Sequence, residues 1–187
     1  MAQLLGPERH ALIVELARLL RAHGSWCGET HLQKAAYFLQ NLASVPLGYS
    51  FILYKHGPFG FELRDDIGGM LAEGYLALKP REYPYGPSIV LDRWGERLLT
   101  EHVEAVSRYR DALDYTARVL GGMNVTELER VSTALLVTRA SPGESVEWRA
   151  GELHRLKPHV SAEDARQAVL KIDALIRGAE EGLHATQ

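Results

Sequence analysis

Cysteine is almost absent from the sequence: Cys27 is the only one among 187 residues. No disulfide can therefore form within the chain, which suits a reducing compartment. No apolar run approaches the roughly 20 residues that a membrane-spanning helix needs. The chain also does not open with a basic segment followed by an apolar stretch, so we see no signal peptide. We expect a cytoplasmic protein without membrane contact.

An excess of basic charge is missing as well. The formal net charge is −3, with 46% apolar and 24% charged residues, which is typical of an ordinary globular protein. Proteins that bind nucleic acid by neutralising phosphates are usually basic. The charge balance therefore argues against strong non-specific nucleic-acid binding, although a local basic patch is compatible with it.

The sequence contains no enzyme signature. It has no P-loop and no G-x-S-x-G motif, and "EHVEA" lacks the second histidine of a zinc-protease motif. Cys27 and His31 are four residues apart, but two ligands are too few for a structural zinc site. A nucleophilic cysteine would also need a base and a lowered pKa. We therefore expect no catalytic residue, no metal site and no cofactor.

Apolar periodicity predicts three helices in the first part of the chain. The first begins near Pro7, and the second begins at a capping box formed by Thr30 and Gln33. The segment "YSFILYK" is a short strand or an extended link. Gly57-Pro58 is then expected to open the third helix, which closes at Gly74.

Two short strands, "YLALK" and "SIVLD", follow and are joined by the loop "PREYPYGP". Three helices followed by a hairpin predict a winged helix-turn-helix-like unit over residues 1–92. Residues 93–187 are expected to form a C-terminal helical appendage that belongs to the same compact unit. The fold class is thus mainly α with a small β-hairpin (α+β).

The appendage is expected to begin with one long helix over residues 93–120. Its narrow apolar stripe should pack mainly on the chain's own C-terminal helices, of which the last ends near Gly178. Arg110 interrupts the stripe and should pair with Asp114 at the i+4 position. We therefore expect a monomer or a weak homodimer.

The third helix has the position of a DNA-reading helix, but it is acidic. It carries four carboxylates against one cation, Arg64, and carboxylates oppose contact with phosphates and base edges. Acids in the first turn also suit the helix dipole. This face is expected to meet solvent or a basic protein partner. The carboxylates are Glu62, Asp65, Asp66 and Glu73.

Residues around the Gly-Pro turn form the candidate partner-binding site. His56 is expected just before a helix start, where it either fixes the turn or binds an anion or a partner's carboxylate. Its aromatic neighbours, Phe61 included, should pack the turn against the core. The candidates are Tyr54, His56, Phe59, Glu62, Asp65 and Asp66.

The expected wing is more basic and carries the candidate nucleic-acid contacts. Basic side chains interleaved with aromatics can follow a nucleic-acid backbone and stack on bases, or they can simply face solvent. These residues are Lys79, Arg81, Tyr83, Tyr85, Arg93 and Arg97. A second cationic stretch is interleaved with acids and is expected to be a mixed charged surface. It contains Arg149, Arg155, Lys157 and His159.

Two family resemblances rest on short motifs. "HLQKAAYFLQ", "YKHGPFGFELRDDI" and "GYL", with "ELHRLKPHVSAEDARQAVLKI" near the C-terminus, resemble the YwgA-like bacterial and archaeal proteins, whose function is not characterised. The chain is more loosely similar to the Panacea, or SocA-like, antitoxin domain, which has a lysine-tyrosine-phenylalanine helix and then a Y-G-P turn. Here that turn reads His56-Gly57-Pro58. The second resemblance implies binding to a protein partner.

These observations favour a non-enzymatic regulatory or assembly protein that acts through protein contacts and is antitoxin-like. A protein partner is favoured over nucleic acid. The alternative is a transcriptional regulator that binds DNA through its wing and its dimer geometry.

Overall fold

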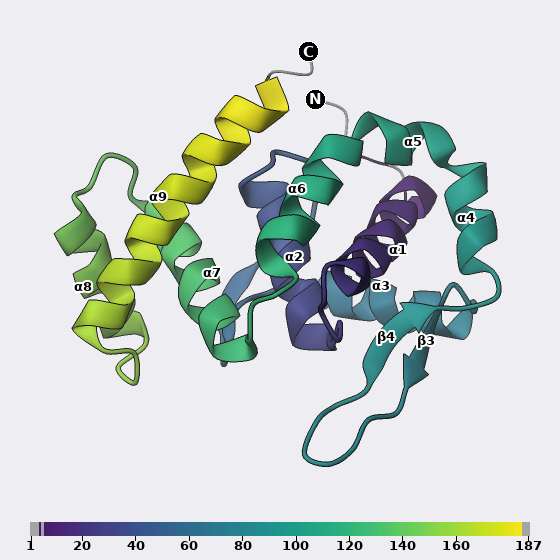
Figure 1. The fold of residues 1–187 in the computed structure, drawn as a ribbon, viewed down its shortest axis with the longest axis horizontal. Coiled ribbons are helices and arrows are strands. Elements are labelled where there is room, and N and C mark those ends of the chain that lie inside the picture. Colours follow the sequence, from purple (N-terminus) through teal and green to yellow (C-terminus); the bar gives the residue numbers. More distant parts are fainter. Residues whose placement is uncertain (1–3, 5, 185–187) are drawn as a thin grey trace.

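The computed structural model describes residue 4 and residues 6–184. This part of the chain is mainly helical, with two small antiparallel two-stranded sheets, as the sequence analysis predicted for the class (Figure 1). None of the described helices is long and apolar enough to cross a membrane. The helices are α1 (Gly6–Ala22), α2 (Glu29–Asn41), α3 (Phe61–Ala72), α4 (Gly95–Glu101), α5 (Val103–Arg108), α6 (Arg110–Leu120), α7 (Val125–Ala140), α8 (Val146–Leu156) and α9 (Ala162–His184).

Helices α1 and α2 form the centre of the molecule (Figure 1). Leu12 and Leu16 of α1 and Phe38 of α2 are fully buried because each helix is covered on several sides. Helices α4, α5 and α6 arch over α1, and α7 packs on the other side of α2, with α8 and α9 beyond it. One continuous hydrophobic core thus joins the N-terminal and C-terminal parts of the chain.

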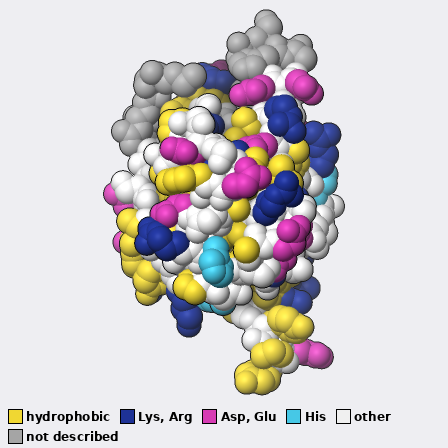
Figure 2. Space-filling view, turned by 90° about the vertical axis from the view of Figure 1, so that its left-hand side faces the viewer, with side chains coloured by type: hydrophobic (Ala, Val, Ile, Leu, Met, Phe, Trp, Pro, Cys, Tyr) yellow, Lys and Arg dark blue, Asp and Glu magenta, His cyan; other side chains and the backbone are white. Residues whose placement is uncertain are grey.

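The predicted hairpin after α3 is present. Strand β3 (Leu76–Lys79) pairs antiparallel with β4 (Ser88–Leu91), with Leu76 opposite Leu91 and Lys79 opposite Ser88. The connecting loop, residues 80–87, projects from the body of the molecule, and hydrophobic side chains gather at its end (Figure 2). Three prolines limit backbone pairing in this loop.

The expectation that Gly57-Pro58 opens a helix is wrong. Strand β1 (Ile52–Tyr54) and strand β2 (Gly57–Phe59) form a tight hairpin, and α3 begins only after it. Tyr54 pairs with Gly57 across the two-residue turn, so Leu53 and Pro58 form the next pair, which is the non-hydrogen-bonded kind. At a non-hydrogen-bonded position the missing N–H of proline removes no hydrogen bond between the strands, so proline is tolerated in β2.

The long helix expected over residues 93–120 is also wrong. The range is divided into α4, α5 and α6, because His102 (φ −116°, ψ 30°) and Tyr109 (φ −110°, ψ 17°) leave the helical conformation. All three helices contact α1, and α6 also contacts α2, so packing is mainly on N-terminal rather than C-terminal helices. Bending around α1 buries Leu98, Val106 and Leu113, so tertiary packing overrides the local preference for one straight helix.

Arg110 pairs with a different carboxylate from the one expected. Its Nη1 donates to Oε1 of Glu15 on α1 at 2.8 Å, and Asp114 is not its partner. Glu15 also accepts from Nε and Nη2 of Arg18, both at 2.7 Å, and its side chain is only 1% exposed. A buried carboxylate on α1 therefore fixes the position of α6.

Helix α9 is longer than expected and continues through Gly178 to His184. A Cβ atom at Gly178 would lie 3.0 Å from the hydroxyl of Tyr115. That hydroxyl donates to the carbonyl of Leu175 at 2.7 Å. The glycine therefore marks a close contact between α6 and α9 rather than the end of the helix.

We predict that Glu15→Gln lowers the free energy of unfolding by about 2 kcal/mol, because two guanidinium groups lose a buried carboxylate but stay partly solvated. Urea denaturation measures the change. Glu101→Gln is the control, since its ion pair with Arg97 is solvent-exposed and should contribute little. If the two substitutions lowered the free energy of unfolding equally, the buried ion pairs of Glu15 would not contribute more than an exposed pair.

Candidate functional site

The β1–β2 hairpin is held on α2 by two buried polar side chains. The amide of Gln33 donates to the carbonyl of Gly60 and accepts from its N–H, both at 3.0 Å. Nζ of Lys34 donates to the carbonyl of Pro58 at 2.7 Å. Gln33 therefore does not form the expected capping box with Thr30, and the residue that caps α2 is Gly28.

Helix α7 supports the hairpin from another side. Gly57 has a φ of +89°, and a Cβ atom there would lie 2.9 Å from Oγ of Ser132 and 3.2 Å from Oγ1 of Thr133. No side chain fits at this position, and the backbone conformation itself favours glycine. The Gly-Pro motif is therefore needed for close packing of a hairpin on α7, not for starting a helix.

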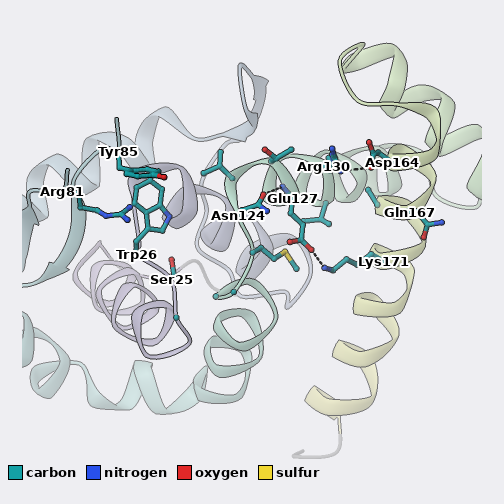
Figure 3. Close-up of a pocket in the computed structure, with 18 residues that line it drawn as sticks. Ser25, Trp26, Arg81, Tyr85, Asn124, Glu127, Arg130, Asp164, Gln167 and Lys171 are labelled. Carbon is teal, nitrogen blue, oxygen red and sulfur yellow. Dashed lines mark hydrogen bonds and ion pairs between the residues drawn. The ribbon is translucent and has the colours of Figure 1, made fainter. Parts of the chain in front are cut away.

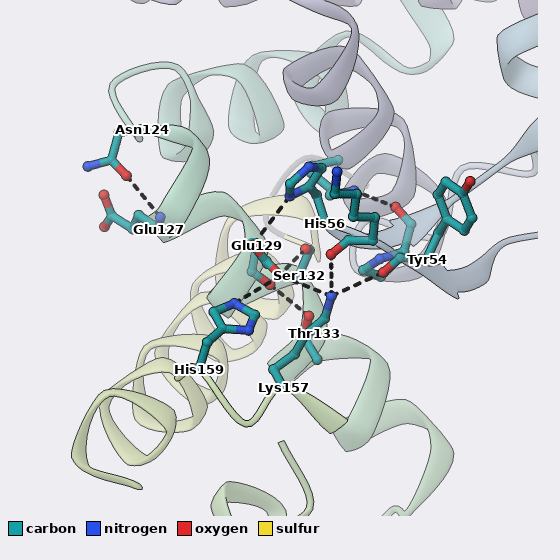
Figure 4. Close-up of polar contacts among 12 residues, drawn as sticks. Tyr54, His56, Asn124, Glu127, Glu129, Ser132, Thr133, Lys157 and His159 are labelled. Atoms are coloured by element: carbon teal, nitrogen blue, oxygen red, sulfur yellow. Dashed lines mark hydrogen bonds and ion pairs between the residues drawn. The ribbon is translucent and has the colours of Figure 1, made fainter. Parts of the chain in front are cut away.

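A carboxylate of α7 lies between one lysine and two histidine side chains (Figure 4). Glu129 is buried, and its Oε1 lies 2.9 Å from Nζ of Lys157 and 3.4 Å from Nε2 of His159. Its Oε2 lies 3.7 Å from Nδ1 of His56. His56 thus occupies the turn of the hairpin and faces α7, so its expected position before a helix N-terminus is wrong.

Lys157 connects the C-terminal helices to the hairpin. Its Nζ donates to the carbonyls of Tyr54 at 3.0 Å and Lys55 at 2.7 Å, in addition to its contact with Glu129. Lys157 is buried, as is Arg149, which forms two hydrogen bonds with Asp173. The expectation of a mixed charged surface is therefore wrong for these two residues, because both are buried and pair with carboxylates that are distant in the sequence.

Burial changes the protonation of Lys34. It lowers the pKa of Lys34 to about 8, while the charge of Glu129 opposes this effect and the like charge of Lys157 adds to it. The ammonium group has a backbone carbonyl as its hydrogen-bond acceptor rather than a carboxylate. The hairpin is therefore anchored by a lysine whose charge is costly inside the protein.

Of the aromatic residues beside the turn, Tyr54 and Phe61 face solvent instead of packing the turn against the core, whereas Phe59 is half-buried. The rings of Tyr54, Phe59 and Phe61 lie 5.1–5.8 Å apart, centroid to centroid. Tyr54 is 53% exposed and Phe61 is 45% exposed. Ile52, opposite Phe59 in the hairpin, is 51% exposed. We call Ile52, Tyr54, Phe59 and Phe61 the aromatic patch.

The acidic candidates on α3 have different environments. Glu62 and Asp65 are exposed beside the aromatic patch. Asp66 instead accepts from the hydroxyl of Tyr49 at 2.8 Å and pairs with Arg9 at 2.8 Å. The structure therefore brings Tyr54, Phe59 and the first two acids together, whereas Asp66 ties α3 to α1 and His56 faces α7.

The hairpin β3–β4 carries a stack that the sequence analysis did not identify (Figure 3). The guanidinium carbon of Arg81 lies 3.9 Å from the ring centroid of Trp26 and 4.8 Å from that of Tyr85. Trp26 comes from the loop between α1 and α2, and only its position in an otherwise polar loop could have drawn attention to it. Tyr83, at the end of the projecting loop, is 96% exposed.

The stack borders an open groove of about 980 Å³ that extends to α7 and α9. The groove's other cations are neutralised: Arg130 pairs with Asp164 at 2.8 Å, and Lys171 pairs with Glu127. Elsewhere on the expected nucleic-acid face, Arg97 pairs with Glu101, and Arg93 lies at the far end of β4, beside Trp94. The basic candidates thus do not converge on one surface.

Cys27 and His31 are both buried in the loop and helix start after α1. Burial raises the pKa of Cys27 to about 12, so its thiol stays protonated at neutral pH. The ring of His31 contacts the hydroxyl of Ser25 at 2.8 Å and the carbonyl of Leu120 at 3.0 Å. Within residue 4 and residues 6–184, no group of three His, Cys, Asp or Glu side chains is arranged so that it could hold a metal ion.

No protein-family model matches the sequence, and no curated protein matches it. Two features stand out: the exposed aromatic patch on a tightly anchored hairpin, and a groove beside the β3–β4 loop in which Arg130 and Lys171 are already ion-paired.

We predict that the free energy of unfolding rises by about 1 kcal/mol more in the native protein than in Lys34→Met between pH 7 and pH 9. Above pH 8 the folded protein loses the Lys34 proton, whereas the unfolded chain keeps it up to its ordinary pKa of 10.5, so folding is favoured as the pH rises. Urea denaturation at each pH measures the difference. Cys27 is present in both proteins, so its contribution cancels, and parallel pH profiles would contradict the lowered pKa.

Proposed function

We propose that this protein is a non-enzymatic regulatory or assembly protein of the cytoplasm that acts through protein–protein contacts in an antitoxin-like manner. The aromatic patch is the observation that supports this most strongly. Three large apolar side chains are about half exposed at one place, beside Phe59. Contiguous exposed apolar surface is characteristic of interaction sites, and aromatic residues often dominate binding energy at interfaces.

The anchoring of the hairpin supports the same proposal. Lys34, Gln33 and Lys157 fix its backbone through carbonyl and amide groups, so the patch is held in one shape. A preorganised surface loses less conformational entropy on binding than a flexible one. This explains how exposed rings on a short hairpin could present a specific surface to a partner.

We also propose that residues 1–92 form a winged-helix-like unit. In that interpretation α3 takes the place of the reading helix and β3–β4 the place of the wing. The exposed acids Glu62 and Asp65 on α3 oppose approach to phosphates and favour a basic protein surface. The resemblance to the Panacea antitoxin domain is in line with this, since it implies protein binding.

A DNA-binding regulator is the second candidate. The fully exposed Tyr83 on the projecting loop favours it, because a ring in that position can stack on a base. Arg81 and Arg97, however, already have partners within the chain. We therefore rank this function second.

The test compares two variants of the full-length protein as baits in native lysate. We predict that Tyr54→Ser/Phe61→Ser loses a specific protein that the native bait captures, because both exposed rings are removed. The wing variant Lys79→Gln/Arg81→Gln/Arg93→Gln should still capture it. Circular dichroism should show that the patch variant keeps its fold, since both side chains are exposed.

Binding to random duplex DNA separates the two candidates. We expect weak binding with a shallow dependence on salt concentration. A salt dependence that implies about six or more phosphate contacts, and that the wing variant loses, would favour the DNA-binding regulator instead.

A further inference from the structure

Two adjacent glycines lie on the outer side of α3 without any neighbour. A Cβ atom at Gly68 or at Gly69 would have nothing within 4 Å. Glycine weakens a helix interior relative to almost any other residue. Gly57 and Gly95 are explained by a close neighbour, whereas Gly151 in α8 is as open as Gly68 and Gly69. No contact within the described part of the chain explains Gly68 and Gly69.

These glycines continue the aromatic patch along α3. Phe61, Asp65 and Gly68 are spaced i, i+4 and i+7, so they lie along one face of the helix, and all three are exposed. Ala72, one turn further on, is exposed as well. The surface therefore carries aromatic side chains at the hairpin and residues with little or no side chain toward the end of α3.

Acidic side chains lie within this surface, at Asp65, and along its border, at Glu62 and Glu73. Glu62, Asp65 and Glu73 are exposed, and within the described residues no ion pair neutralises them. Arg64 is the one cation of α3. Such a border attracts basic groups and repels nucleic-acid phosphates and anionic lipid surfaces.

An extended peptide does not fit beside the hairpin. Nζ of Lys157 already occupies the carbonyls of Tyr54 at the end of β1 and of Lys55 in the turn, and Lys34 occupies the carbonyl of Pro58 on β2. Strand addition needs such backbone groups to be free. A helix needs only side-chain contacts, and small residues allow its axis to approach α3 closely.

We propose that the aromatic patch together with Asp65, Gly68, Gly69 and Ala72 forms a docking surface for an α-helix of a partner protein. The partner helix has an apolar face that covers the rings and the glycines, and basic residues along its borders that meet the acids of α3. This inference rests on the proposed function and specifies the partner's chemistry.

The glycines allow a test in which loss of binding cannot be caused by unfolding. Gly68→Gln/Gly69→Gln should raise the melting temperature, because glutamine is a better helix former and has room at both positions. The same variant should weaken binding, because the added side chains keep a partner helix away from α3. Gly151→Gln is the matched control: Gly151 is exposed in α8, also has nothing within 4 Å, and should affect stability only.

The probe is a designed amphipathic helical peptide of about 18 residues, or five turns, with leucine on one face and lysine on the other. A second peptide carries glutamate in place of lysine. In fluorescence anisotropy titrations we expect the lysine peptide to bind at least about tenfold more tightly than the glutamate peptide. The glycine variant should weaken this binding about tenfold, and Gly151→Gln should leave it unchanged.

Equal binding of the two peptides, or full binding to the stabilised glycine variant, would overturn the proposal of a basic helix. A different result would reject the proposed function. If lysate capture depends on Tyr54 and Phe61 while the lysine peptide does not bind, the protein-binding function stands and only the helix is rejected. If neither binds through the patch, both are rejected.

Discussion

The buried carboxylate of Glu129 joins three segments that are far apart in the sequence. Through Lys157 it connects α7 to the C-terminal helices, and Lys157 in turn holds the carbonyls at the turn of the β1–β2 hairpin. Lys34 fixes the same hairpin to α2. The hairpin has only two short strands and could not be stable alone. Its shape, and with it the exposure of the aromatic patch, depends on these buried charges.

Buried charges are an expensive way to hold a hairpin, since desolvation offsets much of the Coulombic attraction. Apolar residues could hold it by non-directional packing, whereas Lys34 and Lys157 bind individual carbonyl oxygens and so define the position of the backbone. We interpret this arrangement as a means of specificity. It keeps Tyr54 and Phe61 at the surface, where collapse onto the core would otherwise be favourable.

Local sequence patterns predicted the elements better than their connections. The apolar periodicity of α1 and the strands β3 and β4 could be predicted because each depends on neighbouring residues. The bend of residues 93–120 around α1 could not, because it is produced by a surface that forms only in the folded protein. Of the candidate site, sequence reasoning identified Tyr54 and Phe59 but placed them against the core. Their exposure follows from the hairpin, whose anchors lie about 25 and about 100 residues away along the chain.

In our proposal the face of the β1–β2 hairpin, and not the β3–β4 loop, meets the partner. Site-specific photo-crosslinking in living cells tests it most directly, with a benzophenone amino acid placed at Tyr54 in one strain and at Tyr83 in another. Both side chains are exposed, so either probe can be accommodated. We predict a discrete protein adduct from position 54 and no nucleic-acid adduct from position 83. A DNA adduct from position 83 with no protein adduct from position 54 would contradict it.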